Sequence, residues 1–147
     1  MKQKIRGLPQ AELGCGAAAE VVLAAEQQLA LVFPPSYREF LREFGWIRFN
    51  HFEIYGLGAD APDYLNVVRN TLAEREEMSP GLPRHFVALM NDGAGNHYCL
   101  DTGTAKDGEA VVVFWDHESS QDQEPEFVAV SFAEWLIGLI TRANGDS

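Results

Sequence analysis

The sequence predicts an α+β fold in which a mainly antiparallel sheet packs against helices. Two observations predict this class. Helical periodicity dominates the first half of the chain, whereas short apolar runs separated by turn residues occupy most of the second half. No helical segments separate these late strand-like runs, and parallel strands would need such crossovers. The length of 147 residues fits one domain.

The first predicted helix spans about residues 17–32. Phe33-Pro34-Pro35 ends it, because proline cannot continue a helix and also restricts the residue before it. Apolar residues recur along the helix at three- and four-residue intervals and predict one buried stripe. They are Ala18, Val22, Ala25, Leu29 and Val32.

The second predicted helix begins at Ser36. Ser36 and Glu39 have the spacing of a capping box, in which each side chain accepts a hydrogen bond from the other residue's backbone N–H. Gly45 is suited to the left-handed conformation that terminates many helices. The predicted buried face comprises Tyr37, Phe40, Leu41 and Phe44.

A short strand over Phe52–Tyr55 and a third helix over about Pro62–Glu77 are expected next. Proline is favourable in the first turn of a helix, where its missing N–H costs nothing. The segment Ser79–Pro83 has the composition of a loop. The predicted inner side of the third helix comprises Tyr64, Leu65, Val68 and Leu72.

Four strands are expected from residue 86 onward: Phe86–Met90, His97–Asp101, Ala110–Trp115 and Phe127–Val130. Turn residues at 91–96 separate the first two strands and predict a hairpin. The third is β-branched and aromatic, as is typical of a central strand. A last helix then begins with a second capping box, Ser131 and Glu134. Its predicted buried face comprises Phe132, Trp135, Leu136, Leu139 and Ile140.

The charge is unevenly distributed along the chain. The net charge is −11, and residues 85–147 hold two basic and eleven acidic side chains, whereas residues 1–84 hold nine and eleven. A nucleic-acid binder needs a basic surface, so this class is excluded. An acidic C-terminal half would accelerate association with a basic partner, although acidic surfaces also serve solubility alone.

The sequence predicts neither a membrane segment nor a disulfide. No apolar run approaches the roughly 20 residues that a membrane span needs. Cys15 and Cys99 lie in unlike contexts, and we expect two free thiols. The polar, basic first ten residues do not resemble a signal peptide, so we expect a cytoplasmic protein.

No pattern in the sequence predicts catalysis, a cofactor or a metal. The segment Asp92–Asn96 is glycine-rich but lacks the lysine of a phosphate-binding loop, and we interpret it as a turn. The chain has no Gly-x-Ser-x-Gly nucleophile motif. The histidines stand in four separate segments without metal-ligand spacing. They are His51, His85, His97 and His117.

The best candidate for a partner-binding segment is the polar loop 118–126 with its flanking residues. Its acidic side chains are suited to arginine and lysine on a basic protein, and the alternative is a solvated loop without a partner. The candidate residues are Asp116, Glu118, Asp122, Glu124 and Glu126. Trp46, Phe49 and Phe52 form either an exposed binding hot spot or part of the core.

Five segments, in this order, resemble the SUKH family of cell-wall-regulator-like domains. The first, Phe33–Leu41, is similar to the family's proline–tyrosine–phenylalanine–leucine helix, although only Gly45 remains of the Asn-Gly-Gly that often follows it. The other segments are Phe52–Leu57, the hairpin Val87–Asp101, the valine- and tryptophan-containing strand Val111–Glu118 and the closing Ser131–Leu136. The similarity covers roughly residues 17–140.

The resemblance implies a binding scaffold, because family members serve widely in bacteria as immunity proteins against toxins, nucleases prominent among them. It carries over no catalytic residue. The implied function is an immunity protein that binds and neutralises a cognate toxin domain, which the acidic half of the chain predicts to be basic. The alternatives are a general interaction or regulatory module and a small enzyme or ligand-binding domain. The oligomeric state stays open.

Overall fold

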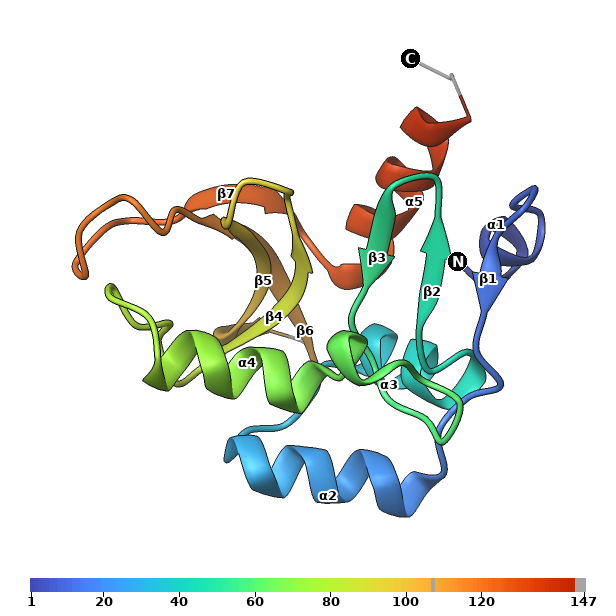
Figure 1. The fold of residues 1–147 in the computed structure, drawn as a ribbon, viewed down its shortest axis with the longest axis horizontal. Helices are drawn as coiled ribbons and strands as arrows, with labels where there is room; N and C mark the ends of the chain where they lie inside the picture. The colour runs from blue at the N-terminus through green and yellow to red at the C-terminus, as the bar shows by residue number, and fades with distance from the viewer. Residues whose placement is uncertain (107, 145–147) are drawn as a thin grey trace.

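The computed structural model describes residues 1–106 and 108–144, and Figure 1 shows their arrangement. The elements are α1 Lys2–Arg6, β1 Glu12–Leu13, α2 Ala19–Leu29, α3 Pro35–Glu43, β2 Ile47–Phe49, β3 Phe52–Ile54, a 3-10 turn Asp63–Leu65, α4 Val67–Glu76, β4 Phe86–Asn91, β5 His97–Lys106, β6 Glu109–Trp115, β7 Glu126–Ala129 and α5 Phe132–Ala143. Four of these five helices precede β4, and the four strands of the larger sheet follow one another after α4, as is typical of an α+β fold.

The strands form two antiparallel sheets, ordered β1-β2-β3 and β4-β5-β6-β7. The sheets meet where the Tyr55 N–H donates to the Leu89 carbonyl at 2.8 Å, just beyond the end of β3. The expected class and the antiparallel pairing are therefore confirmed. The hairpin of β4 and β5 is also confirmed, although β5 continues to Lys106, five residues beyond the predicted end.

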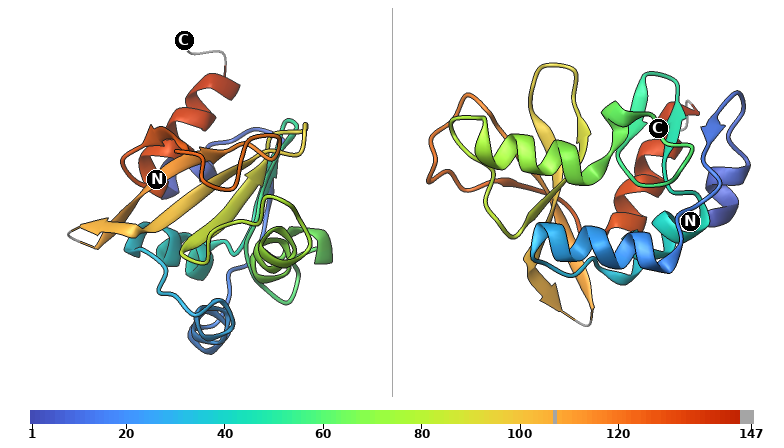
Figure 2. Two further views of the ribbon diagram at one scale, coloured as in Figure 1. Left: turned by 90° about the vertical axis from the view of Figure 1, so that its left-hand side faces the viewer. Right: turned by 60° about the horizontal axis from the view of Figure 1, so that its bottom comes forward.

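Helices cover both faces of the second sheet. On one face, the Thr71 hydroxyl of α4 accepts a hydrogen bond from the Ala88 N–H of β4 at 3.1 Å. On the other face, Trp135 of α5 packs against Tyr98 of β5, with ring centroids 5.8 Å apart. The views in Figure 2 show α2 as a neighbour of α4. Arg75 of α4 links the two helices by donating to the Leu29 carbonyl at 3.0 Å.

The first long helix is shorter than predicted. Ala30 adopts a left-handed conformation with φ +57° and ends α2 at Leu29, before the prolines are reached. Val22, Ala25 and Leu29 are buried as expected, but Val32 is 67% exposed and Ala18 is also exposed. The predicted burial of Ala18 and Val32 is therefore wrong, because both residues lie outside α2.

The predicted capping box of the second helix is wrong. Pro34 is the N-cap of α3, and no side chain caps this helix. Ser36 instead contacts a distant strand, since its hydroxyl and its N–H both donate to the Glu109 carboxylate of β6, at 2.8 and 3.1 Å. The predicted end is confirmed: Gly45 has φ +82° and its N–H donates to the Phe40 carbonyl.

The predicted third helix is interrupted. Asn66 is extended, and its side chain accepts a hydrogen bond from the Arg69 N–H at 2.9 Å, so it caps a new helix, α4. The residues before it form only a 3-10 turn. This break turns Tyr64 outward to 51% exposure, contrary to the prediction, whereas Leu65 and Val68 are buried.

The closing helix confirms its predicted start. Ser131 is the N-cap of α5, and its hydroxyl accepts a hydrogen bond from the Glu134 N–H at 3.1 Å. Its predicted buried residues are all buried: Phe132, Trp135, Leu136, Leu139 and Ile140. Their packing against the second sheet and α3 forms the centre of the core.

Candidate protein-binding surface

The acidic residues selected from the sequence lie together at the β7 edge of the second sheet. Asp116 directly follows β6 and is half-buried. Glu118, Asp122 and Glu124 are exposed on the loop that joins β6 to β7, at the left of Figure 1. Glu126 is also exposed and is the first residue of β7. We call this loop, residues 116–126, the acidic loop.

Two glutamines fix the course of the acidic loop. The side-chain amide of Gln121 donates to the Gly81 carbonyl at 2.7 Å and accepts from the Gly81 N–H at 2.8 Å. Gln123 makes the same two-way contact with the backbone of Asp116, at 2.8 and 3.1 Å. The carboxylates are thus presented on a backbone that is already held, which reduces the entropy lost on binding.

Four acidic side chains of the first half are paired with lysine or arginine. These pairs are Lys2 with Glu39, Arg6 with Glu43, Arg38 with Glu26, and Arg48 with Glu12. In the part of the chain that the structure describes, no lysine or arginine lies within ion-pair distance of the acidic loop. Glu118 approaches only the imidazole of His117, at 3.9 Å. The acidic loop is therefore a cluster of four exposed carboxylates without a lysine or arginine partner among the described residues.

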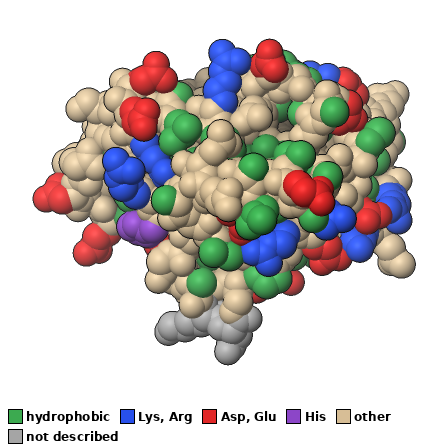
Figure 3. Space-filling model, turned by 90° about the horizontal axis from the view of Figure 1, so that it is seen from below, with side chains coloured by type: hydrophobic (Ala, Val, Ile, Leu, Met, Phe, Trp, Pro, Cys, Tyr) green, Lys and Arg blue, Asp and Glu red, His purple; other side chains and the backbone are tan. Residues whose placement is uncertain are grey.

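Another face of the molecule lacks such an excess. Figure 3 shows the side on which α2 lies, with lysine and arginine side chains interspersed among aspartates and glutamates. Opposite charges that alternate over a surface largely cancel beyond the screening length of about 8–10 Å. The acidic loop is therefore better suited than the side of α2 to attract positive charge.

The aromatic cluster after α3 belongs to the core. Trp46 is 6% and Phe49 is 2% exposed, while Phe52 is half-buried and packs against Phe49 with ring centroids 5.4 Å apart. The Trp46 indole N–H donates to the Asp60 carboxylate at 3.1 Å. Of the two alternatives left open by the sequence, the structure supports the core.

Sequence reasoning missed a different apolar surface. Phe127 on β7 is 59% exposed and Val130, just after β7, is 62% exposed. The other eight phenylalanines are buried or half-buried. The sequence marked this segment as extended, but it gave no sign that the strand lies at an edge of the sheet.

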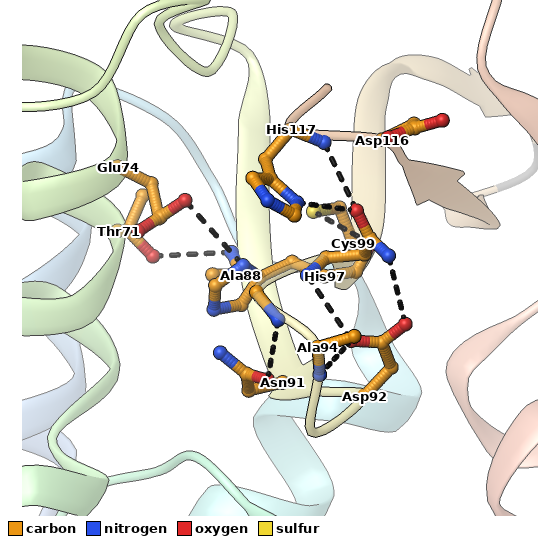
Figure 4. A network of polar contacts seen from close by, with 12 residues as sticks. Thr71, Glu74, Ala88, Asn91, Asp92, Ala94, His97, Cys99, Asp116 and His117 are labelled. Carbon is orange, nitrogen blue, oxygen red and sulfur yellow. Dashed lines mark hydrogen bonds and ion pairs between the residues drawn. The ribbon is translucent and has the colours of Figure 1, made fainter. Parts of the chain in front are cut away.

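The glycine-rich segment after β4 is a turn closed by its own side chains, as predicted (Figure 4). The Asn91 side chain accepts from the Gly93 N–H at 2.7 Å, and the Asp92 carboxylate accepts from the Ala94 N–H at 2.8 Å. A phosphate would need these backbone donors. Because carboxylate and amide oxygens already occupy them, the turn has no free cradle for an anion.

His97 is buried between the second sheet and α4 (Figure 4). Its Nδ1 lies 3.4 Å from a Glu74 carboxylate oxygen and its Nε2 lies 3.3 Å from the Tyr55 hydroxyl. Burial lowers the pKa of His97 to about 4, with the charge of His117 acting in the same direction and that of Asp92 opposing it. The imidazole is therefore neutral at pH 7. Its contact with Glu74 is then not an ion pair, although the distance of 3.4 Å would allow one.

The burial of His97 predicts that the protein loses stability in mild acid. Between about pH 6.5 and 4 the unfolded chain takes up a proton that folded His97 refuses, so stability falls as the pH drops through this window, by at most about 3 kcal/mol. Burial raises the pKa of Glu74, which acts in the opposite sense and offsets part of the loss. Urea unfolding of the wild type and of His97→Phe at pH 7 and about pH 4.5 measures the effect. We expect a smaller loss in the variant, and equal losses would contradict this assignment.

The remaining cysteine and histidine side chains form no further site in residues 1–106 and 108–144. Cys15 is exposed and Cys99 is buried, and both thiols are free, as predicted. Burial raises the pKa of the Cys99 thiol. No group of three or more His, Cys, Asp or Glu side chains is placed to hold a metal ion in this described part. None of its helices is long and apolar enough to cross a membrane.

Comparisons with known proteins agree with this architecture. A crystal structure of a protein from Pseudomonas syringae pv. tomato is similar, with a TM-score of 0.60 over 84% of this chain and 91% of that chain. At 16% sequence identity, this likeness concerns the fold alone. The family model SUKH_6, described as SMI1-KNR4 cell-wall, matches residues 20–136. Since the match extends over most of the sequence and agrees with the motifs found in it, the chain belongs to the SUKH family.

Proposed function

We propose that this protein is an immunity protein, which binds a cognate toxin domain stoichiometrically and blocks its active site or substrate groove. SUKH proteins often act in this way, and membership of this family supports the proposal. The observation that carries the proposal is the set of carboxylates on the acidic loop without lysine or arginine partners in the described part of the chain.

The chemistry of the acidic loop fits a basic protein surface. Asp116, Glu118, Asp122, Glu124 and Glu126 lie within eleven residues on a backbone held by glutamine contacts. Carboxylates arranged in this way attract arginine and lysine, raise the association rate and disfavour partners of like charge. The substrate groove of a nuclease is one surface with the required positive charge.

In this proposal the protein is a single domain over residues 1–147 and acts in the cytoplasm. It inhibits the toxin by occupying the toxin's active site or substrate groove. It needs neither a cofactor nor a metal, because blocking a groove requires only affinity and correct placement. Nucleic acid is not its partner, since a chain with a net charge of −11 repels phosphate. We expect the toxin to bind this protein and not other SUKH proteins. The acidic loop and its neighbouring residues provide this specificity, whereas the fold is shared by the family.

Co-expression with the toxin domain encoded beside this gene tests the proposal. We expect growth to be rescued and a 1:1 complex to elute from size exclusion, whereas a SUKH protein paired with a different toxin should do neither. A catalytically inactive toxin allows the complex to be purified without killing the cells that produce it. Absence of both rescue and complex would show the function to be wrong, and an acidic toxin domain that is nevertheless neutralised would show the electrostatic part to be wrong.

A further inference from the structure

The free edge of the second sheet is formed by β7. This strand pairs with β6 through Val113–Phe127 and Phe114–Glu126, and it is the last strand of its sheet. Within the described residues, no backbone hydrogen bond joins its outer edge to another segment. The edges of the first sheet are shorter: β1 has two residues, and β3 has three and is joined to β4 just beyond its end, at Tyr55. Edge strands of soluble proteins are usually guarded by charged side chains, proline, a bulge or a covering segment. β7 has Glu126 and a bulge at Val128, but its Phe127 side chain stays exposed.

The side chains at this edge make an apolar surface next to the acidic loop. Phe127 is 59% exposed and Val130 is 62% exposed, so both remain in water in the isolated chain. Beside them lies a groove of about 500 Å³. It is lined by Tyr98, Phe114, Glu126, Phe127, Val128 and Arg142. An exposed aromatic side chain that borders a groove has the character of a binding hot spot.

We propose that β7 is the contact strand for the toxin, and that an extended segment of the toxin adds to its free edge. In this arrangement an apolar side chain of the segment packs against Phe127, while flanking lysine or arginine side chains meet Glu124 and Glu126. Backbone hydrogen bonds provide affinity in such strand additions, and the side chains provide specificity. The inference rests on the proposed function and deepens it, because it names the surface and the chemistry of the segment that binds.

The charges favour this occupant over a second copy of the same chain. Glu124 lies two residues before β7 and Glu126 is its first residue. Each copy carries a net charge of −11, so pairing of two β7 edges brings like charges together. Arg142 also lines the groove, so we expect cations to be attracted at Glu126 and not over the whole groove. A bulge at Val128, between the pairs Val112–Ala129 and Val113–Phe127, keeps the added segment short.

The test measures the affinity of the purified protein for its neighbouring toxin domain, in an inactive form. Phe127→Ala should weaken binding by at least about 30-fold, because Phe127 is the proposed anchor. Phe127→Tyr should retain most of the affinity. Leu23→Ala is the matched control: Leu23 lies on α2 and is 56% exposed, so the change removes a similar apolar surface elsewhere and should alter affinity by no more than about twofold. Thermal melts verify that all three variants fold.

Hydrogen exchange separates strand addition from a mere side-chain contact. We expect the amides of residues 126–129 that point away from β6 to become protected in the complex, whereas those paired with β6 are already hydrogen-bonded. If the wild type binds the toxin but Phe127→Ala binds equally well, or if protection appears elsewhere, the strand proposal is wrong and the immunity function stands. If the wild type binds no toxin, the function itself fails. A dimer of the free protein that Phe127→Lys dissolves would identify a second copy as the occupant and overturn the proposal.

Discussion

Gly56→Ala is expected to prevent folding. A Cβ atom on Gly56 would lie 1.5 Å from the Gly45 carbonyl oxygen and 3.3 Å from the Trp46 Cα. Both contacts are with backbone, so no side chain can move aside. We expect a loss of more than about 4 kcal/mol, which approaches the whole stability of an ordinary domain. Circular dichroism and the yield of monomeric protein measure the outcome.

The contact at Gly56 cannot relax because three segments meet there. The Gly56 N–H donates to the Leu65 carbonyl and its own carbonyl accepts from the Val67 N–H, both at 2.9 Å. The Leu57 N–H donates to the Gly45 carbonyl, also at 2.9 Å. To admit a methyl group, the end of α3 would have to separate from the chain before α4, and these hydrogen bonds would be lost.

Gly138→Ala is the matched control for this substitution. Gly138 lies inside α5, and an added Cβ would have as its nearest neighbour the flexible end of Arg142, 4.0 Å away. Because glycine disfavours a helix interior, we expect stability to rise by about 0.5–1 kcal/mol. If Gly56→Ala melted within a few degrees of the wild type, the close approach of these three segments would be contradicted.

The fold could be predicted where local chemistry decides the structure. The Ser131 cap of α5, the hairpin turn at Asp92 and the left-handed Gly45 each follow from residues within a few positions of one another. The capping box at Ser36 failed because a partner 73 residues away, Glu109, competes for the same hydroxyl. The break at Asn66 was missed because an asparagine cap inside a helical pattern resembles an ordinary polar helix residue.

The elements near the N-terminus could not be predicted for a similar reason. The segment Lys2–Arg6 is polar and short, and no local pattern favours a helix there. Its single buried residue is Ile5, and Arg6 pairs with Glu43 of α3. The strand β1 has two exposed residues, which no alternation can reveal. Contacts with distant segments therefore stabilise these elements.

The candidate surface shows the same division between local and distant information. Composition alone identified the acidic loop, since carboxylates without nearby cations in the sequence also lack them in the described structure. For the aromatic residues, the sequence could not decide which are buried. The structure shows that Trp46 and Phe49 lie in the core, whereas Phe127 is exposed. A strand of four residues has the same sequence pattern at the centre and at the edge of a sheet, so only the topology reveals that Phe127 is exposed at an edge.

Neutralising the acidic loop is expected to slow association with the toxin about 100-fold at low ionic strength. The variant combines Glu118→Gln, Asp122→Asn, Glu124→Gln and Glu126→Gln, all exposed positions, and reduces the net charge from −11 to −7. Attraction between unlike charges can raise association rates 10- to 1000-fold and is lost when one side is neutral. Stopped-flow kinetics over a series of salt concentrations measure the rate.

A control with the same net charge separates the position of these carboxylates from their number. Glu20→Gln, Asp63→Asn, Glu76→Gln and Glu77→Gln also remove four exposed carboxylates, all from the first half of the chain. This control should associate within about threefold of the wild type, and the rates of all three proteins should converge in about 1 M salt, where the screening length falls to about 3 Å. Equal slowing in both variants would mean that overall charge, and not the acidic loop, attracts the toxin. Because the acidic loop is held by Gln121 and Gln123, neutralisation leaves its backbone contacts intact, so a selective loss of rate can be assigned to charge.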